Sequence, residues 1–273
     1  FLAFLDSGIR DRLIGARKTF PTGKAESELL IALAPHVEDF LARLFGIEAE
    51  ARALAEKHNA LAPLWAVKRQ FVQRRALNKV KPGDANADCF EFSSEIEFAR
   101  QVSEWLKNET ANAENLERAA KYAAWAATTP EGKAKHRQGV LFKAPQKLDY
   151  MKLIPVDAEL RRREGFALTD PGTDLAGALG EANYCIWCHE QGKDSCSKGL
   201  REKPPAEGFR KSVFGVSLAG CPLEEKISEM HLLKRRGDSI AALALVCIDN
   251  PMAAGTGHRI CNDCMKACVY QKQ

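Results

Sequence analysis

The sequence predicts an all-α protein, and three observations support this fold class. Apolar residues recur every three or four positions through most of the first 180 residues, as they do on the buried face of a helix. Short segments that contain proline, glycine or capping residues separate these periodic stretches. No run of alternating β-branched residues is long enough to predict a strand.

The first expected helices are long. Residues 25–45 and residues 48–79 each carry an apolar stripe at helical spacing. Pro35 and Pro63 lie inside these stretches, and because proline lacks a backbone N–H and crowds the preceding turn, we expect them to kink or divide the helices.

Two further helices and an irregular connector follow. Ser93 or Ser94 is placed to cap a helix that runs to about residue 106, and residues 113–128 supply another. Residues 129–172 contain several prolines and read as a connector. We therefore expect two domains: a helical domain over residues 1–172, and a second domain over residues 173–273.

The cysteines are concentrated in the second domain. Eight of the nine lie in the last 89 residues, whereas core cysteines would be scattered wherever a small apolar group fits. Seven have the spacing of metal ligands. They are Cys185, Cys188, Cys196, Cys221, Cys261, Cys264 and Cys268. Cys89 and Cys247 are expected to be ordinary packing thiols. The clustered cysteines predict a metal site.

The spacing suggests how these cysteines meet. Cys185-x2-Cys188 brings two thiolates to one side of a turn, and a third cysteine farther on can return to the same site. Cys221 precedes Pro222, which predicts a helix that begins there with its amides directed at the sulfur. Cys261, Cys264 and Cys268 have intervals that place them on one face of a helical turn.

Two helices are expected between these cysteine groups. The first carries an apolar face and ends at Gly237, and Asp238 is placed to cap the second. The second helix ends at Asn250-Pro251, and Cys247 falls in its apolar stripe.

Composition limits the possible functions. With 273 residues and 45% hydrophobic residues, the chain can form its core without disulfides, so the thiols are expected to stay reduced in the cytoplasm. A net charge of +4 is too small to predict a nucleic-acid partner. No apolar run approaches the length that a membrane span requires. Because the chain starts at Phe1, we expect it to be a fragment.

The order of these motifs resembles the α-helical ferredoxin domain that opens the small subunit of glutamate synthase and the N-terminus of dihydropyrimidine dehydrogenase. The similar stretch runs from Tyr184 to Cys268, and its most specific parts are GCPLEEKISEMHLLKRRGDSIAALALVCIDNPM and GHRIC. The resemblance implies an α-helical ferredoxin-type fold with one or two 4Fe-4S clusters. It further implies electron transfer to or from a flavoprotein domain or subunit.

The resemblance also implies a ligand assignment. One cluster would be held by Cys185, Cys188, Cys196 and Cys268. Three irons of the other would be held by Cys221, Cys261 and Cys264. FAD and NAD(P) would then be bound by missing downstream domains or by a partner. The chain would be the iron-sulfur portion of an FAD-dependent NAD(P) oxidoreductase rather than a complete enzyme.

Three features depart from the family pattern. Twenty-four residues separate Cys196 from Cys221 where the family has only a few, so residues 197–220 are an insertion. The interval between Cys261 and Cys264 is shorter than usual. Seven cysteines leave two clusters one ligand short, which a truncated C-terminus explains, although His258, Asp263 or Gln271 are also possible substitutes.

Two other interpretations compete with this one. The two Cys-x2-Cys pairs are able to form a four-thiolate zinc site in a helical interaction module without redox activity, but zinc ribbons place their pairs much closer together, and zinc leaves Cys196, Cys221 and Cys268 unexplained. A complete enzyme is disfavoured by the lack of a dinucleotide-binding, phosphate-binding or nucleophile-elbow motif; Gly255-Thr256-Gly257 alone is weak support for dinucleotide binding.

Overall fold

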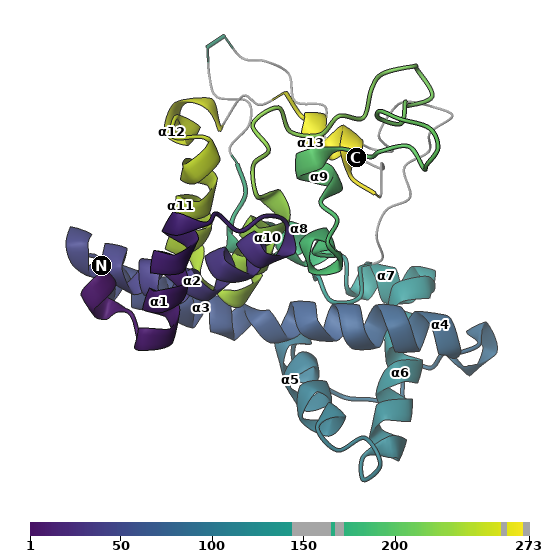
Figure 1. Cartoon of the computed structure of the whole chain (residues 1–273). Helices are drawn as coiled ribbons and strands as arrows, with labels where there is room; N and C mark the ends of the chain where they lie inside the picture. The colour runs from purple at the N-terminus through teal and green to yellow at the C-terminus, as the bar shows by residue number, and fades with distance from the viewer. Residues whose placement is uncertain (144–164, 167–171, 258–260, 270–273) are drawn as a thin grey trace. The chain divides into compact units, whose positions relative to one another are not determined.

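Every regular element is a helix in the part of the chain that the computed structural model describes, which is residues 1–143, 165–166, 172–257 and 261–269 (Figure 1). The all-α prediction is confirmed for these residues. The α-helices are α1 (Ser7–Lys18), α2 (Lys24–Phe45), α3 (Glu48–Val67), α4 (Leu77–Lys79), α5 (Glu95–Leu106), α6 (Ala113–Thr128), α7 (Pro130–Lys135), α8 (Leu175–Tyr184), α9 (Ser195–Lys198), α10 (Ile227–Arg236), α11 (Ser239–Asp249), α12 (Ala253–Thr256) and α13 (Asp263–Ala267).

The chain divides into two compact units. Residues 1–57 and 177–273 form one, here called the cysteine unit, and residues 58–176 form the other, the bundle unit. The expected boundary after residue 172 lies close to the second crossing between the units. The first crossing, inside α3, has no counterpart in the expected division, because residues 1–57 group with the cysteine-rich residues. Much of the expected connector, residues 144–164 and 167–171, lies outside the described residues.

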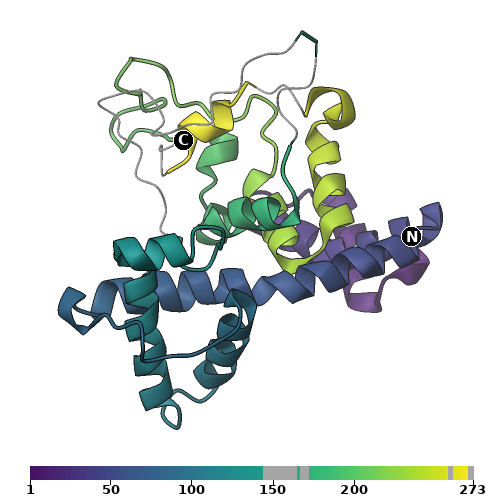
Figure 2. The same ribbon diagram turned by 180° about the vertical axis from the view of Figure 1, so that it is seen from behind.

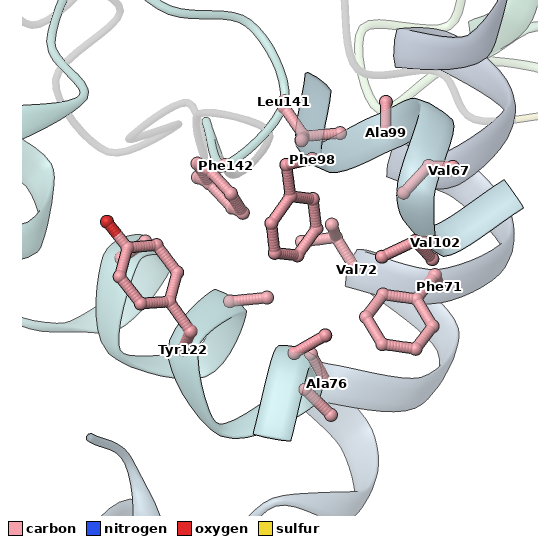
Figure 3. Packing of buried hydrophobic residues seen from close by; sticks show 14 of the residues in the cluster. Val67, Phe71, Val72, Ala76, Phe98, Ala99, Val102, Tyr122, Leu141 and Phe142 are labelled. Atoms are coloured by element: carbon pink, nitrogen blue, oxygen red, sulfur yellow. The ribbon is translucent and has the colours of Figure 1, made fainter. Parts of the chain in front are cut away.

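The bundle unit is built around a core of aromatic and small side chains (Figure 3). Phe71 and Phe98 are fully buried, and Tyr122 and Phe142 close the same cluster. Alanines on the inner face of α6 let that helix approach its neighbours closely, since an alanine adds little bulk to the interface. At the start of α5, the hydroxyl of Ser94 accepts the N–H of Glu97 as a helix cap.

Pro35 and Pro63 do not divide their helices, so that part of the expectation is wrong. α2 continues through Pro35, and α3 continues through Pro63. Buried residues lie on both sides of each proline, and their packing outweighs the missing backbone hydrogen bond. After α3, residues Lys68–Ala76 form a π-helical segment that leads into α4.

In the cysteine unit, α2 packs through two faces. Leu29 and Leu33 form a cluster with Leu5 and with apolar residues of α1. Ala34 instead joins residues of α10 and α11, and the three helices α2, α10 and α11 lie side by side in both views (Figures 1 and 2). The N-terminal helices are therefore part of the scaffold that supports the cysteine-rich residues.

Polar contacts also join α2 to this pair of helices. Oε2 of Glu38 accepts the N–H of Ala241 at 2.7 Å and so caps α11 from a neighbouring helix. Asp238, the expected cap, makes no side-chain capping bond. Ser27 donates its hydroxyl to Oε1 of Glu229, which is 1% exposed. A helix cap that comes from another element cannot be found from local sequence.

The ends of the two helices follow the sequence more closely. Gly237 adopts a left-handed conformation and its N–H donates to the carbonyl of Leu233, which ends α10 as expected. The buried side chains of α11 are Ala241, Ala242 and Leu245, which lie on one face of the helix. Cys247 lies on the opposite side and is exposed, so the expectation of a buried thiol is wrong.

Candidate metal centre

Cys185 and Cys188 are held by a tight turn that follows α8. Trp187, between them, has a left-handed backbone (φ 52°), and its N–H donates to Sγ of Cys185 at 3.3 Å. Cys188 then begins a short 3-10 helix, Cys188–Gln191. The turn brings the two thiols near enough for one to affect the ionisation of the other. This is the arrangement that the Cys-x2-Cys spacing predicts.

Cys196 and Cys268 join this pair from two distant segments. Cys196 lies in α9 and Cys268 directly follows α13, and the two short helices pack together (Figures 1 and 2). Cys268 lies close enough to Cys196 to raise the pKa of its thiol. Cys268 also interacts electrostatically with Cys185 and Cys188. These four thiols are called the first thiol group.

The remaining three predicted ligands form a second thiol group. Cys264, in α13, interacts electrostatically with Cys221 and with Cys261. Cys264 is half-buried, whereas Cys261 is exposed. Residues 261–268 therefore contribute to both groups, with Cys268 in the first group and Cys261 and Cys264 in the second. His258 and Gln271, named above as possible further ligands, lie outside the described residues.

The two ends of the insertion between Cys196 and Cys221 lie side by side. The N–H of Cys221 donates to the carbonyl oxygen of Cys196 at 2.8 Å. Gly220 (φ 83°) crosses the chain so closely that a Cβ there would lie 2.5 Å from the backbone nitrogen of Gly199. Backbone hydrogen bonds within the insertion, such as Leu200 N–H to Leu218 O, hold its two arms together. The insertion therefore does not separate the two cysteines in space.

Cys221 does not begin a helix, so that expectation is wrong. The N–H of Glu224 donates to the carbonyl of Cys221 at 3.0 Å and closes a turn. Glu224 has a left-handed backbone (φ 50°), which cannot continue a right-handed helix, and α10 begins only at Ile227. The sulfur of Cys221 is thus placed by a turn that contains Pro222.

The surroundings of the first group raise the pKa of three of its thiols, those of Cys185, Cys188 and Cys196. Burial raises the pKa of Cys185 and of Cys188, and the neighbouring thiols add to the rise. The pKa of Cys196 is raised first by its hydrogen bond with Cys268 and then by burial. Several potential anions in a partly dehydrated space repel one another, so their thiolate forms require a cation. A bound metal would supply that charge and release the protons.

The pKa of Cys264 in the second group is raised in the same way. Burial is the main cause, and Cys221, Cys261 and Glu225 add to it. A donor set of thiols near one another and shielded from water suits soft, thiophilic metals, and above all zinc and iron-sulfur clusters. The chemistry of both groups therefore fits the predicted ligand type.

Buried polar side chains surround the first group, and sequence reasoning did not find them. Ser228 lies close enough to Cys185 to lower the pKa of its thiol, and its Oγ lies 2.7 Å from Nδ1 of His189. Both side chains are at most 5% exposed. Among the described residues, buried atoms of His189, Asp194 and Glu229 have no hydrogen-bond partner. Burial, and then Glu229, raise the pKa of Asp194 to about 7.

The thiols of each group lie near one another, but this does not by itself give them the geometry that coordinates a metal ion. Within residues 1–143, 165–166, 172–257 and 261–269, no three His, Cys, Asp or Glu side chains are arranged to hold a metal ion. A four-iron cluster binds each cysteine to a different iron, so its ligands stand farther apart than those of a single ion. In the same described ranges, no helix has both the length and the apolar character needed to cross a bilayer.

A close relative places the chain in a family. The protein is 33% identical over 242 residues to "Uncharacterized protein RP005" of Rickettsia prowazekii (strain Madrid E), and the match covers 76% of this chain and 80% of that relative. The chain belongs to the RP005 family. A model of the RP005 N-terminal alpha-helical domain matches residues 1–46. In this member of the RP005 family, that match spans α1 and α2 and ends at Gly46, the left-handed residue that closes α2.

A second similarity is short. Over 22 residues the chain is 82% identical to "Uncharacterized protein RP006" of the same organism. The match covers 8% of this chain and 3% of that protein. No solved structure matches. In the RP005 family member described here, the N-terminal family domain packs on α10 and α11, the helices that lie between Cys221 and Cys261 in the sequence.

Proposed function

We propose that the chain is an electron-transfer module in which an α-helical ferredoxin-type domain binds one or two 4Fe-4S clusters. The observation that carries the proposal is the division of the seven cysteines into a group of four and a group of three. These are the two ligand sets that the family resemblance implies. Packing alone gives no reason for thiols from four separate segments to gather in two places.

The residues around the thiols have a defined task in this proposal. When bound, the clusters supply one-electron exchange, and the protein sets their position and potential. Cys185 accepts a hydrogen bond from the N–H of Trp187 and lies beside Ser228, and both lower the pKa of its thiol by stabilising negative charge on the sulfur. Burial of the first group keeps water away from it, which strengthens these electrostatic effects.

The proposed partner is a flavoprotein domain or subunit of an NAD(P)-linked oxidoreductase in the cytoplasm. FAD and NAD(P) would be bound there, and this chain would be the iron-sulfur portion of that enzyme. The support is the resemblance of residues 184–268 to domains that work beside flavins. The alternative remains a helical interaction module that zinc stabilises and that has no redox activity.

Metal analysis of the purified chain tests the proposal. The protein, prepared without oxygen and reconstituted with ferrous iron and sulfide, should contain iron and acid-labile sulfide and absorb broadly in the violet. Cys185→Ser should remove one cluster, whereas Cys247→Ser should remove none, because Cys247 lies exposed outside both groups. A colourless protein with stoichiometric zinc would favour the alternative. Unchanged iron in Cys185→Ser would remove that residue from the ligand set.

A further inference from the structure

The insertion over residues 197–220 carries an exposed apolar turn, residues 212–216, which is here called the tip. Val213 is 95% exposed, Phe214 is 80% exposed, and Val216 is exposed as well. The insertion extends outward beyond α9 in both views (Figures 1 and 2). We propose that the tip inserts into the surface of an anionic lipid membrane, on which the chain lies without crossing it.

The tip is an ordered turn. The N–H of Ser212 donates to the carbonyl of Val216 at 2.8 Å, and the N–H of Gly215 donates to the carbonyl of Ser212 at 2.9 Å. The hydroxyl oxygen of Ser212 accepts the N–H groups of Phe214 and Val216 at 3.3 and 3.2 Å. The apolar side chains are therefore held in water by a defined backbone, and burial against another apolar surface is favourable for them.

The hydrogen bonds of the tip suit an apolar environment. The N–H groups of Ser212, Phe214, Gly215 and Val216 are all donated inside the turn. An unpaired amide is costly in lipid, where no water can bond to it. A protein partner that adds a strand relies on free backbone groups, and the tip has few to offer. These bonds therefore favour a lipid surface over a protein partner.

Cations flank the tip without accompanying carboxylates. Arg210 and Lys211 directly precede it and are exposed, and neither makes an ion pair with another described side chain. Lys211 pairs with Ser217 across the ribbon, and successive side chains of an extended segment point to opposite faces, so one cation lies on each side. Residues 208–223 contain no Asp or Glu. Cations around an apolar tip complement an anionic layer of lipid headgroups.

Vesicle binding of the purified chain tests the proposal. Vesicles of phosphatidylcholine and phosphatidylserine in a two-to-one ratio are sedimented with the protein, and pure phosphatidylcholine vesicles are the neutral comparison. We expect binding to the anionic vesicles that weakens about tenfold in Phe214→Ala. The double variant Arg210→Gln/Lys211→Gln should bind about 20-fold more weakly, because each cation near an anionic membrane contributes about fivefold. Added salt should weaken wild-type binding by screening these charges.

Phe214→Trp shows whether the tip itself enters the lipid. The introduced indole should shift its fluorescence to shorter wavelength when anionic vesicles are added, while the wild-type spectrum stays unchanged. Two matched controls should bind as wild type. Phe20→Ala removes another exposed phenylalanine of the cysteine unit, and Arg52→Gln/Lys57→Gln removes two exposed cations of α3. Circular dichroism should show equal helix content in all variants.

The readout does not depend on the proposed function, because neither the tip nor its flanking cations belong to a thiol group. Equal binding of Phe214→Ala and wild type would overturn the membrane proposal, as would equal binding to neutral and anionic vesicles. An unshifted Phe214→Trp spectrum on bound protein would also overturn it. A chain that binds neither kind of vesicle would do the same and would leave a protein pocket as the occupant of the tip.

Discussion

Ser228 Oγ lies 2.7 Å from Nδ1 of His189, and both side chains are buried beside the first thiol group. Ser228 also lies close enough to the sulfur of Cys185 to lower the pKa of that thiol. Burial lowers the pKa of His189 and so favours its neutral form. Ser228 is thus close both to the buried His189 and to the sulfur of one proposed ligand.

Replacement of Ser228 should lower the reduction potential of the cluster in the first group. A hydrogen bond to a ligand sulfur stabilises the more negative, reduced state, so Ser228→Ala should shift the potential to more negative values without loss of iron. A redox titration followed by electron paramagnetic resonance measures the shift. Ser103→Ala, the same change on α5 in the bundle unit, is the control. An unchanged potential in Ser228→Ala would show that the hydroxyl has no such effect.

Removal of the Lys226 charge should destabilise the cysteine unit. Nζ of Lys226 lies 3.6 Å from Glu26 of α2 and 3.3 Å from Asp249 of α11, and its side chain is only 13% exposed. Lys226→Met leaves two mostly buried carboxylates without their cation, at a cost of about 1–3 kcal/mol. Urea unfolding followed by circular dichroism measures this cost. Lys24→Met breaks only an exposed pair with Glu28 and should cost less than about 1 kcal/mol.

The bundle unit should lose stability in mild acid. His136 contacts the hydroxyl of Tyr122 at 3.0 Å and Glu95 at 3.5 Å. Burial holds its pKa below 6.5, although Glu95 opposes the shift. The unfolded chain therefore binds the proton more readily, and the stabilisation is complete above about pH 6.5 and declines as the pH falls through that value. Urea midpoints from tryptophan fluorescence should fall more steeply with acid in wild type than in His136→Gln.

Truncation of Phe98 should destabilise the bundle unit strongly. Phe98 is 0% exposed, and the rings of Phe92 and Phe142 contact it with centroids 5.0 and 5.1 Å away. Phe98→Ala leaves a cavity among these rings, so the free energy of unfolding should drop by about 3–5 kcal/mol. Phe20→Ala, at a residue 77% exposed, should change it by less than about 0.5 kcal/mol. Similar losses in both variants would contradict this account.

The sequence was sufficient for features that depend on neighbours in the chain. The helical class, the cap at Ser94 and the end of α10 at Gly237 follow from local spacing and backbone preference. It was insufficient where tertiary packing decides. Helices continue through Pro35 and Pro63 because buried residues on both sides hold them.

The same limit applies to the candidate site. Cysteine spacing identified seven residues, but their division into two groups came from the family resemblance and not from the intervals. Ser228 carries no spacing signal, since it reaches Cys185 only after α10 has formed. The start of α10 was placed too early because a proline after Cys221 is compatible with a turn as well as with a helix.

The two ends of residues 197–220 lie together, which allows the length of this insertion to vary among members of the protein family. Since Cys196 and Cys221 are joined by their own backbones, the length of chain between them has no influence on the distance between the two sulfurs. Sequence can be lengthened, shortened or exchanged at that position while Cys196 and Cys221 keep their places. Family members with very different intervals in this region are therefore compatible with the same placement of Cys196 beside Cys221, and the insertion is a suitable point for attaching a label or a tether.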